Sequence, residues 1–329
     1  MNPFEYERVS TADDAVQSVV RPNHTRFLAG GTNLVDLMKG SVETPTRLVD
    51  INRLPLNAIE ALPDGGLRLG AVARNSDTAA HPLVRSNYPL LSQAILSGAS
   101  PQLRNQATNA GNLLQRTRCY YFMDTGSPEC NKRAPGSGCG AIDGFNRIHA
   151  IFGASKSCIA THPSDMCVAL AALDATIRVR SAHGQRWIPM GRFHRLPGDS
   201  PWLDTVLQPD ELILSIDLPP SPYAAHSHYL KVRDRASYAF ALISVAAALE
   251  LEGNRIRSAR IALGGVAHKP WRARSAEQSL AGATASLAVF ESAARRAVQG
   301  AKPYTFNKFK VDMTREAIVR ALHIAGGLA

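Results

Sequence analysis

Five cysteines lie close together in the sequence, and the rest of the chain has none. They are Cys119, Cys130, Cys139, Cys158 and Cys167. A disulfide framework spreads cysteines through a small secreted domain, whereas thiols gathered in one segment of a 329-residue chain favour metal or iron–sulfur ligation. Four thiolates are the usual ligand set both of a 4Fe–4S cluster and of a structural zinc ion.

The spacing of the first four cysteines does not decide between these metals. Ten, eight and eighteen residues separate successive members, so the C-x-x-C pair of a zinc ribbon or a bacterial ferredoxin is absent. Residues 116–156 are rich in Gly and Pro, which predicts a long irregular segment that needs a cross-link to stay ordered. Unligated cysteines are the third interpretation, which their clustering disfavours. Cys167 falls on an expected helix at 166–173, where a buried, inert thiol is predicted.

Three short segments of small and polar residues could bind an anionic cofactor. They are Phe27-Leu28-Ala29-Gly30-Gly31-Thr32-Asn33-Leu34, Thr108-Asn109-Ala110-Gly111-Asn112-Leu113 and Ala160-Thr161-His162-Pro163-Ser164-Asp165. In the first, two glycines stand between an expected strand and an expected helix start, where backbone N–H groups and the helix dipole favour a phosphate. A plain strand–helix turn is the alternative there, and the G-x-G-x-x-G fingerprint of a nicotinamide site is absent. Taken alone, Asp165 is expected to cap the following helix, and His162 is as readily a structural histidine as a cofactor contact.

Three successive units are expected to position these segments. In the first, the strands are expected at 4–9, 26–29 and 48–51, with helices ending at Val19 and Lys39. The S-x-x-D pattern of Ser10 and Asp13 predicts a capping box for the earlier helix. The second unit is expected to hold strands at 67–71, 177–180 and 212–218 and a helix at 89–96. Beyond the linker at 219–222, strands at 229–233, 243–251 and 255–263 and helical segments at 275–301 and 314–325 are expected.

Composition excludes several other classes of protein. The net charge of +10 and the pI of about 9.6 come from scattered Lys and Arg, and aromatic residues make up 6% of the chain without a stacking pattern, so nucleic acid is not expected as a partner. The longest apolar stretch, 239–249, is too short to span a membrane. The N-terminus lacks a signal peptide, so folding in the cytoplasm is expected. No Ser–His–Asp set or paired carboxylates stand out, which favours leaving substrate chemistry to another subunit.

Together, the three polar segments resemble those of the FAD-binding subunits of the xanthine dehydrogenase (molybdenum hydroxylase) family. The resemblance covers nearly the whole chain and includes Lys231-Val232-Arg233-Asp234-Arg235-Ala236-Ser237-Tyr238 and Leu263-Gly264-Gly265-Val266. It implies an α+β architecture: a vanillyl-alcohol-oxidase (PCMH)-type FAD-binding fold of two α/β subdomains, followed by an α+β domain like that of CO dehydrogenase flavoproteins. The implied domains are 1–56, 57–222 with a cysteine-rich insert at about 116–158, and 223–329.

The resemblance also implies a set of FAD-binding residues. Residues 27–34 would surround the diphosphate, and the remaining expected contacts are Thr108, Gly111, Asn112, Arg118, His162, Asp165, Ile216 and Lys231. His162, Ile216 and Lys231 would lie nearer the flavin ring. The diphosphate, ribose or adenine end would be held by Thr108, Gly111, Asn112 and Asp165. The chain departs from the pattern at Ala110, where many relatives have Gly and where Ala disfavours a positive φ.

The cysteine-rich insert is similar to one in the periplasmic aldehyde oxidoreductase branch of the family. The matching runs are Gln115-Arg116-Thr117-Arg118-Cys119, Cys130-Asn131-Lys132-Arg133 and Gly136-Ser137-Gly138-Cys139. This similarity implies that Cys119, Cys130, Cys139 and Cys158 bind a 4Fe–4S cluster.

A heterotrimer is implied in turn. A large molybdenum-cofactor subunit would oxidise an aldehyde, a small 2Fe–2S subunit would pass electrons on, and FAD on this chain would deliver them to an external acceptor. Export to the periplasm would then depend on a partner that carries a signal. The alternatives are a stand-alone flavin oxidase or reductase on the same fold, and a zinc-stabilised assembly subunit without redox activity.

Overall fold

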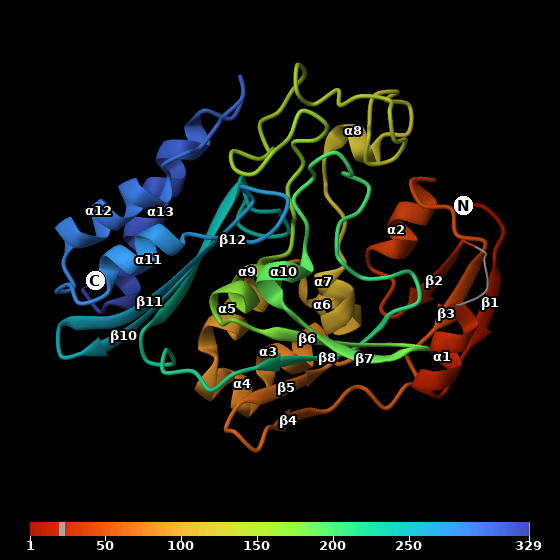
Figure 1. Cartoon of the computed structure of the whole chain (residues 1–329), viewed down its shortest axis with the longest axis horizontal. Coiled ribbons are helices and arrows are strands. Elements are labelled where there is room, and N and C mark those ends of the chain that lie inside the picture. Colours follow the sequence, from red (N-terminus) through yellow and green to blue (C-terminus); the bar gives the residue numbers. More distant parts are fainter. Residues whose placement is uncertain (20–23, 329) are drawn as a thin grey trace.

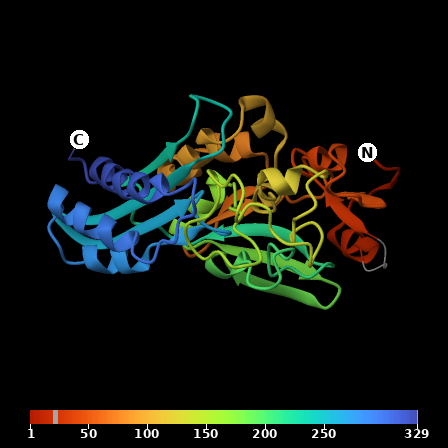
Figure 2. The ribbon, with the colours of Figure 1, turned by 90° about the horizontal axis from the view of Figure 1, so that it is seen from above.

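The computed structural model describes residues 1–19 and 24–328. In this described part, three β-sheets follow one another along the chain, and the two ends of the chain lie at opposite sides of the molecule (Figures 1 and 2). Residues 116–158 form a largely irregular layer at the top of Figure 1. Mixed helix and strand content confirms the α+β class.

The first sheet is parallel and has the strand order β1-β3-β2. Its segment contains β1 (Glu5–Arg8), α1 (Ala12–Val19), β2 (Thr25–Leu28), α2 (Leu34–Lys39) and β3 (Arg47–Asp50). The capping box of α1 lies one residue later than the sequence predicts. The Asp14 backbone N–H donates to Thr11 Oγ1 at 3.1 Å, and that hydroxyl donates to the Asp14 carboxylate at 2.6 Å, so Thr11 and Asp14 form the box in place of Ser10 and Asp13.

The second sheet is antiparallel and has the strand order β4-β5-β8-β6-β7. Its strands are β4 (Ile59–Ala61), β5 (Leu67–Gly70), β6 (Thr176–Ser181), β7 (Gly184–Pro189) and β8 (Leu212–Leu218). Its helices are α3 (Asn75–Ala80), α4 (Pro82–Asn87), α5 (Pro89–Ser97), α6 (Pro101–Gln106), α7 (Asn109–Leu113), α8 (Tyr120–Met123), α9 (Asp165–Ala172) and α10 (Met190–Phe193). The helices from α3 to α9 and the irregular insert all fall between β5 and β6 in the sequence.

The third sheet is antiparallel, in the order β12-β11-β10-β9, and carries helices on one face (Figure 1). It comprises β9 (Ser227–Val232), β10 (Ile243–Glu252), β11 (Arg255–Gly264) and β12 (Trp271–Arg272), followed by α11 (Arg274–Leu280), α12 (Leu287–Ala297) and α13 (Phe309–Ala325). The single helical segment expected at 275–301 is wrong. It is divided between α11 and α12 by a turn that contains Gly282 at φ +82, a conformation that ends a helix at little cost only for glycine.

Strand β10 explains why the apolar run at 239–249 is not amphipathic. Ala246 and Ala248 pack with the core of the second sheet, and Val245 and Leu249 pack with the core beneath α11–α13. Because successive side chains point to opposite faces of a sheet, a strand buried on both faces is apolar at every position.

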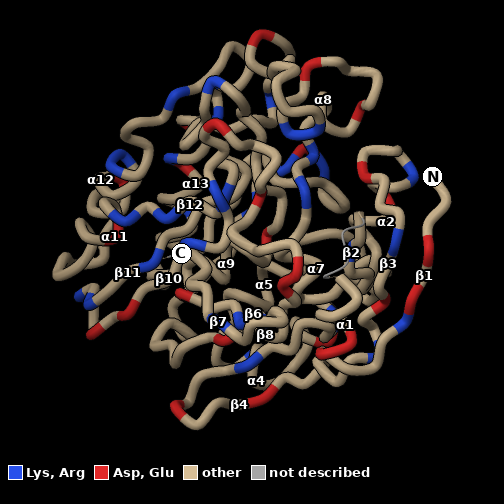
Figure 3. The backbone as a smooth tube through the Cα atoms, turned by 45° about the vertical axis from the view of Figure 1, so that its right-hand side comes forward, with Lys and Arg blue, Asp and Glu red and all other residues tan. Residues whose placement is uncertain are grey.

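Helix α9 connects the second and third sheets, since it packs against α5 on one side and against β10 and β11 on the other. All of its residues are buried, so it is apolar all round except at Asp165, its first residue. No helix in residues 1–19 and 24–328 is long and apolar enough to cross a membrane. Lys and Arg are spread along the entire trace (Figure 3).

Candidate functional site

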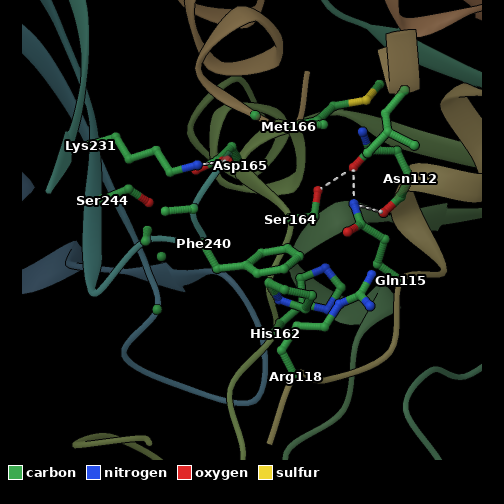
Figure 4. Close-up of a pocket in the computed structure, with 18 of the residues that line it drawn as sticks. Asn112, Gln115, Arg118, His162, Ser164, Asp165, Met166, Lys231, Phe240 and Ser244 are labelled. Atoms are coloured by element: carbon green, nitrogen blue, oxygen red, sulfur yellow. Dashed lines mark hydrogen bonds and ion pairs between the residues drawn. The ribbon is translucent and has the colours of Figure 1, made fainter. Parts of the chain in front are cut away.

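A cavity of about 650 Å³ is lined by residues from all three predicted domains (Figure 4). The segment before α2 contributes Thr32 and Asn33, and the helices from α5 to α7 contribute a wall that includes Gly111 and Asn112. The segment 161–166 and residues between β9 and β10 close the remaining sides. The cavity therefore lies where the three polar segments of the sequence meet.

The Gly-Gly turn makes a close backbone contact with the end of α6. A Cβ on Gly30 would lie 2.1 Å from the carbonyl oxygen of Gln106, so only glycine fits there. Gly31 adopts φ +72, and Asn33 accepts a hydrogen bond at 3.0 Å from the backbone N–H of Arg116. The Nδ2 group of Asn33 is buried and has no partner among the described residues. A buried donor without a partner is costly, which favours a bound acceptor at this turn.

Asn112 joins the second and third polar segments through its side chain. Its Oδ1 accepts from Ser164 at 2.6 Å and from Gln115 at 2.8 Å, and its Nδ2 donates to Asn75 at 2.7 Å (Figure 4). Ser164 also caps α9, because its Oγ accepts from the backbone N–H of Cys167 at 3.0 Å. The expected cap at Asp165 is therefore wrong: the preceding serine takes this role and frees the carboxylate.

The Asp165 carboxylate is held inside the cavity wall by two partners. Lys231 Nζ lies 2.7 Å from Oδ2, and the Tyr229 hydroxyl donates to Oδ1 at 2.7 Å. The Asp165 and Lys231 side chains are 7% and 3% exposed. Burial, reinforced by the Asp165 charge, raises the pKa of Tyr229 well above its usual range and keeps that hydroxyl a donor.

Arg118 crosses the cavity beneath the ring of Phe240. Its guanidinium carbon lies 4.9 Å from the ring centroid, and Nη1 lies 3.2 Å from the Asp36 carboxylate. Burial lowers the pKa of Arg118 despite Asp36, and its Nε is buried without a partner in the described chain. His162 lies nearby (Figure 4), and its buried Nε2 likewise has no partner in that part of the chain. Burial and the neighbouring His194 lower the pKa of His162, so its imidazole is neutral.

The charges around the cavity favour an anionic ligand. Its lining includes the cations Arg104, Arg118, Lys231 and Arg235 and the carboxylates Asp36, Asp165 and Asp234. Lys231 is neutralised by Asp165, and Asp36 compensates Arg118 in part. Together with the unpartnered donor of Asn33 beside the Gly-Gly turn, this balance suits a diphosphate.

A second, small cavity is lined by Cys119, Cys130, Cys139 and Cys158. Arg118 lines the first cavity, and Cys119, the next residue, lines the second. The two cavities are therefore adjacent at this point of the chain. Cys130 and Cys139 face each other across an antiparallel bridge, as do Ser155 and Cys158. No three of the four sulfurs lie within 4.8 Å of one another. Within the described chain, the ligand atoms of His162, Cys167 and His194 do lie that close together.

The environments of the four thiols differ. The neighbouring Cys158 thiol lowers the pKa of Cys139 to about 6, and Cys139, together with burial, raises the pKa of Cys158. Backbone N–H groups at Ala141, Ile142 and Ile159 also lower the pKa of Cys139. Burial raises the pKa of Cys119 to about 12 and lowers that of the adjacent His149 to about 4, so this imidazole is neutral at pH 7. Cys167, buried in α9, has its pKa raised to about 12 by burial, consistent with the predicted inert thiol.

A buried ionic network connects the insert to the other segments. Asp204 accepts from Lys132 Nζ at 2.5 Å and from Arg116 Nε at 2.8 Å, and Arg116 also pairs with Glu43. Lys132 and Arg116 outweigh the effect of burial and hold the pKa of Asp204 well below its usual range. The network thus fixes both ends of the 116–132 segment, which carries Arg118 and Cys119.

Comparisons with known proteins agree with this geometry. Residues 2–221 match the family described as the FAD binding domain in molybdopterin dehydrogenase, and residues 228–325 match the CO dehydrogenase flavoprotein C-terminal domain. The chain is 51% identical to the aldehyde oxidoreductase FAD-binding subunit PaoB of Escherichia coli, over 98% of both chains. This chain belongs to the FAD-binding subunits of the molybdenum hydroxylase family. It is therefore an oxidoreductase subunit, as predicted.

Other relatives and solved structures share the fold of this FAD-binding subunit. The glyceraldehyde dehydrogenase medium chain of Sulfolobus acidocaldarius is 30% identical over 85% of this chain and 81% of its own. A carbon monoxide dehydrogenase structure from Hydrogenophaga pseudoflava superposes with a TM-score of 0.78 at 24% identity, covering 99% of this chain and 98% of that one. The expected fold is confirmed.

The cavity fits FAD in the chemistry of its donors. Of the FAD-binding residues expected from the sequence, Thr32, Asn33, Gly111, Asn112, Arg118, His162, Asp165 and Lys231 line it. Gly30 and Thr108 do not line the cavity but support residues that do. Gly30 permits the close contact with Gln106, and Thr108 Oγ1 accepts from the backbone N–H of Gly111 at 3.3 Å. The remaining residues of the first segment, Phe27, Leu28, Ala29, Gly31 and Leu34, carry the turn without lining the cavity.

Ile216, expected near the flavin ring, does not line this cavity. It lies in β8 between Leu69 of β5 and Ile177 of β6, is fully buried, and packs in the core of the second sheet. An apolar side chain on a central strand packs in the core, so Ile216 is not part of this candidate site.

Several residues of the site lie outside the set of contacts that the sequence predicts. Asn75, Gln115 and Phe240 line the cavity, and His194 packs against His162 with ring centroids 4.1 Å apart. Asn75 stands in a short helix outside the three polar segments. Its only signal is an amide at a buried position, and burial cannot be read from the pattern of so short a helix.

Proposed function

We propose that this chain is the FAD- and 4Fe–4S-containing electron-transfer subunit of a heterotrimeric, molybdenum-dependent aldehyde oxidoreductase. The 51% identity to a relative named as an aldehyde oxidoreductase FAD-binding subunit supports the substrate class. The proposed partners are a large molybdenum-cofactor subunit and a small 2Fe–2S subunit. Export to the periplasm together with a signal-bearing partner is part of the same proposal.

The arrangement of four cysteines around one buried cavity is the observation that carries the cluster assignment. A single zinc ion with Zn–S bonds of about 2.3 Å would hold its sulfurs about 3.8 Å apart. In this structure no three of the cysteine sulfurs lie within 4.8 Å of one another, as the ligands of one zinc ion would. A four-iron cluster, whose irons are themselves separated, holds its cysteine ligands farther apart. Backbone N–H groups directed at Cys139 and Cys158 would stabilise thiolate ligands.

The residues of the chain would bind and orient both cofactors. Thr32, Asn33 and Gly111 would bind the diphosphate of FAD, and Arg118 and His162 would contact its ring end. When bound, FAD would supply two-electron redox chemistry toward the external acceptor, and the cluster would supply one-electron transfer. Since Arg118 and Cys119 are neighbours, the chain would hold the two cofactors close together.

Metal and flavin analysis of the full chain tests this proposal. The chain is purified without oxygen as wild type, as Cys130→Ser and as the matched control Cys167→Ser. We expect one FAD and about four irons per wild-type chain, loss of iron but not flavin in Cys130→Ser, and wild-type content in Cys167→Ser. Cys167 is a fair control because it is buried in α9 and does not line the cysteine cavity.

Other contents would contradict parts of the proposal. Zinc in place of iron would overturn the cluster and favour the zinc-stabilised assembly subunit. Flavin without any metal, with substrate turnover by this chain alone, would favour the stand-alone flavin enzyme. Flavin lost from the wild type under all conditions would overturn the FAD site itself.

A further inference from the structure

One histidine lies against the proposed cluster ligands and outside the FAD cavity. His149 is 1% exposed, and its Nε2 lies 3.1 Å from the Sγ atom of Cys119. The rings of Tyr120 and Tyr121 flank it, with centroids 6.4 and 6.5 Å away. The four cysteines already complete the ligand set of a cluster, so this nitrogen is placed to contact a ligand and is not needed as one.

The surroundings of the ring select one of its two neutral tautomers. The Nδ1 atom is buried and has no partner among the described residues. A proton on Nδ1 would bury an N–H group without an acceptor and would turn the Nε2 lone pair toward the sulfur. A proton on Nε2 instead gives an N–H···S hydrogen bond and leaves only an unpartnered acceptor, which is the less costly arrangement.

The C-terminal domain holds the backbone of His149. The carbonyl oxygen of His149 accepts from Lys310 Nζ at 2.9 Å and from Asn307 Nδ2 at 3.2 Å, and its N–H donates to the Asn146 carbonyl at 3.1 Å. Lys310 lies in α13, and Asn307 precedes that helix. Three hydrogen bonds hold the backbone of His149 in place, and from this backbone position its ring reaches Cys119.

We propose that His149 donates a hydrogen bond from Nε2 to Sγ of Cys119 and thereby raises the reduction potential of the cluster bound there. The proposal rests on the proposed function. Reduction adds one electron, whose negative charge is shared with the sulfur ligands. An N–H donor aimed at a ligand sulfur stabilises that charge, so the reduced form gains more than the oxidised form.

Redox titration of the full chain tests the hydrogen bond. Wild type, His149→Phe, His149→Gln and the control His226→Gln are reduced stepwise with dithionite and mediators, and the cluster signal is followed by electron paramagnetic resonance. Phe keeps a planar ring but removes the donor, and the Gln amide can return an N–H near Nε2. We expect full iron in all four, a more negative midpoint potential in His149→Phe, a potential nearer wild type in His149→Gln, and no change in His226→Gln.

A second measurement needs no variant. In wild-type chain labelled with ¹⁵N at histidine, pulsed paramagnetic resonance of the reduced cluster should detect coupling to one histidine nitrogen. Equal midpoint potentials in wild type and an iron-loaded His149→Phe would overturn the inference alone. If His149→Phe loses its iron, absence of the ¹⁵N coupling would overturn it. A wild-type chain that contains no iron would overturn both this inference and the proposed cluster.

Discussion

Gly30 is the residue at which the candidate FAD site has the least room for change. A Cβ there would lie 2.1 Å from the Gln106 carbonyl oxygen, which is backbone and cannot rotate away. We predict that Gly30→Ala separates the turn from α6, destabilises the fold by about 1–3 kcal/mol, and weakens FAD binding at least tenfold. Flavin content after dialysis and the thermal midpoint would measure both effects.

Gly191→Ala is the matched control for this prediction. No atom lies within 4 Å of a Cβ at Gly191, and its φ is not positive, so the same substitution should leave both flavin content and midpoint unchanged. Equal flavin retention by the two variants would show that the close approach of the turn to α6 does not shape the FAD site.

For single residues, the sequence predicts which residues form the site better than it predicts the contacts that each side chain makes. Asn33, Arg118 and His162, which were expected to contact the cofactor, line the cavity. Small polar loops and buried cations have few uses other than ligand binding. The prediction that Asp165 caps α9 is wrong. Both Ser164 and Asp165 can cap a helix, and only the structure shows that Ser164 accepts from the backbone N–H of Cys167. Its partner Lys231 lies 66 residues away, beyond any local pattern.

At the scale of elements, Asn75 in α3 holds two neighbouring segments in register. It donates to Asn109 at 3.1 Å and accepts from Asn112 at 2.7 Å; Asn75 and Asn109 are buried and Asn112 is half-buried. We predict that Asn75→Ala leaves the Nδ2 group of Asn112 without its partner, while Asn109 Oδ1 still accepts from Thr78 at 3.0 Å. The change should cost about 1–3 kcal/mol and weaken FAD binding by displacing α7. Urea unfolding and flavin titration would measure these losses.

Asn87→Ala removes an amide of the same kind at an exposed position at the end of α4. It should change the unfolding free energy by no more than about 0.5 kcal/mol. If Asn75→Ala behaved like Asn87→Ala, the amide network would be dispensable for the register of α3 and α7.

The elements that the sequence predicted correctly are those with their own periodicity or end signals. Helix α2 ends at Lys39 before Gly40, and the strands β8, β10 and β11 follow their apolar runs. The helical segment at 275–301 was not resolved into two helices, because its Ala-rich composition suits a helix on either side of Gly282. The insert has almost no regular structure, so its course depends on side-chain contacts such as Lys132 with Asp204.

At the scale of the whole molecule, the insert is held by contacts that no local pattern encodes. Lys310 of α13 is fully buried and donates to the carbonyls of Ile148, His149 and Gly265. Asn307 reaches the carbonyls of His149 and Ala150. A lysine at this position reads as an ordinary surface residue of a helix, and its role becomes visible only when α13 is packed against the insert.

This buried lysine predicts a pH dependence of stability. Burial, with a further contribution from the Arg147 charge, lowers the pKa of Lys310 to about 7 from its ordinary 10.5. Between pH 7 and pH 10.5 the Lys310 side chain is protonated in the unfolded chain and deprotonated in the folded chain. The free energy of unfolding therefore rises with pH in this range, in total by up to roughly 1.4 kcal/mol for each unit by which the pKa is lowered. Below pH 7 both states are protonated and this contribution to stability is absent.

Lys310→Met should remove this dependence. Urea unfolding is followed by circular dichroism at pH 6, 7.5 and 9. Because other groups titrate alike in both chains, the wild-type urea midpoint should rise relative to that of Lys310→Met as the pH increases. Lys302→Met, at an exposed position before α13, should run parallel to wild type at every pH. A constant gap between wild type and Lys310→Met would mean that Lys310 stays protonated throughout. Its three carbonyl contacts would then compensate the charge fully, and the connection between α13 and the insert would not depend on pH.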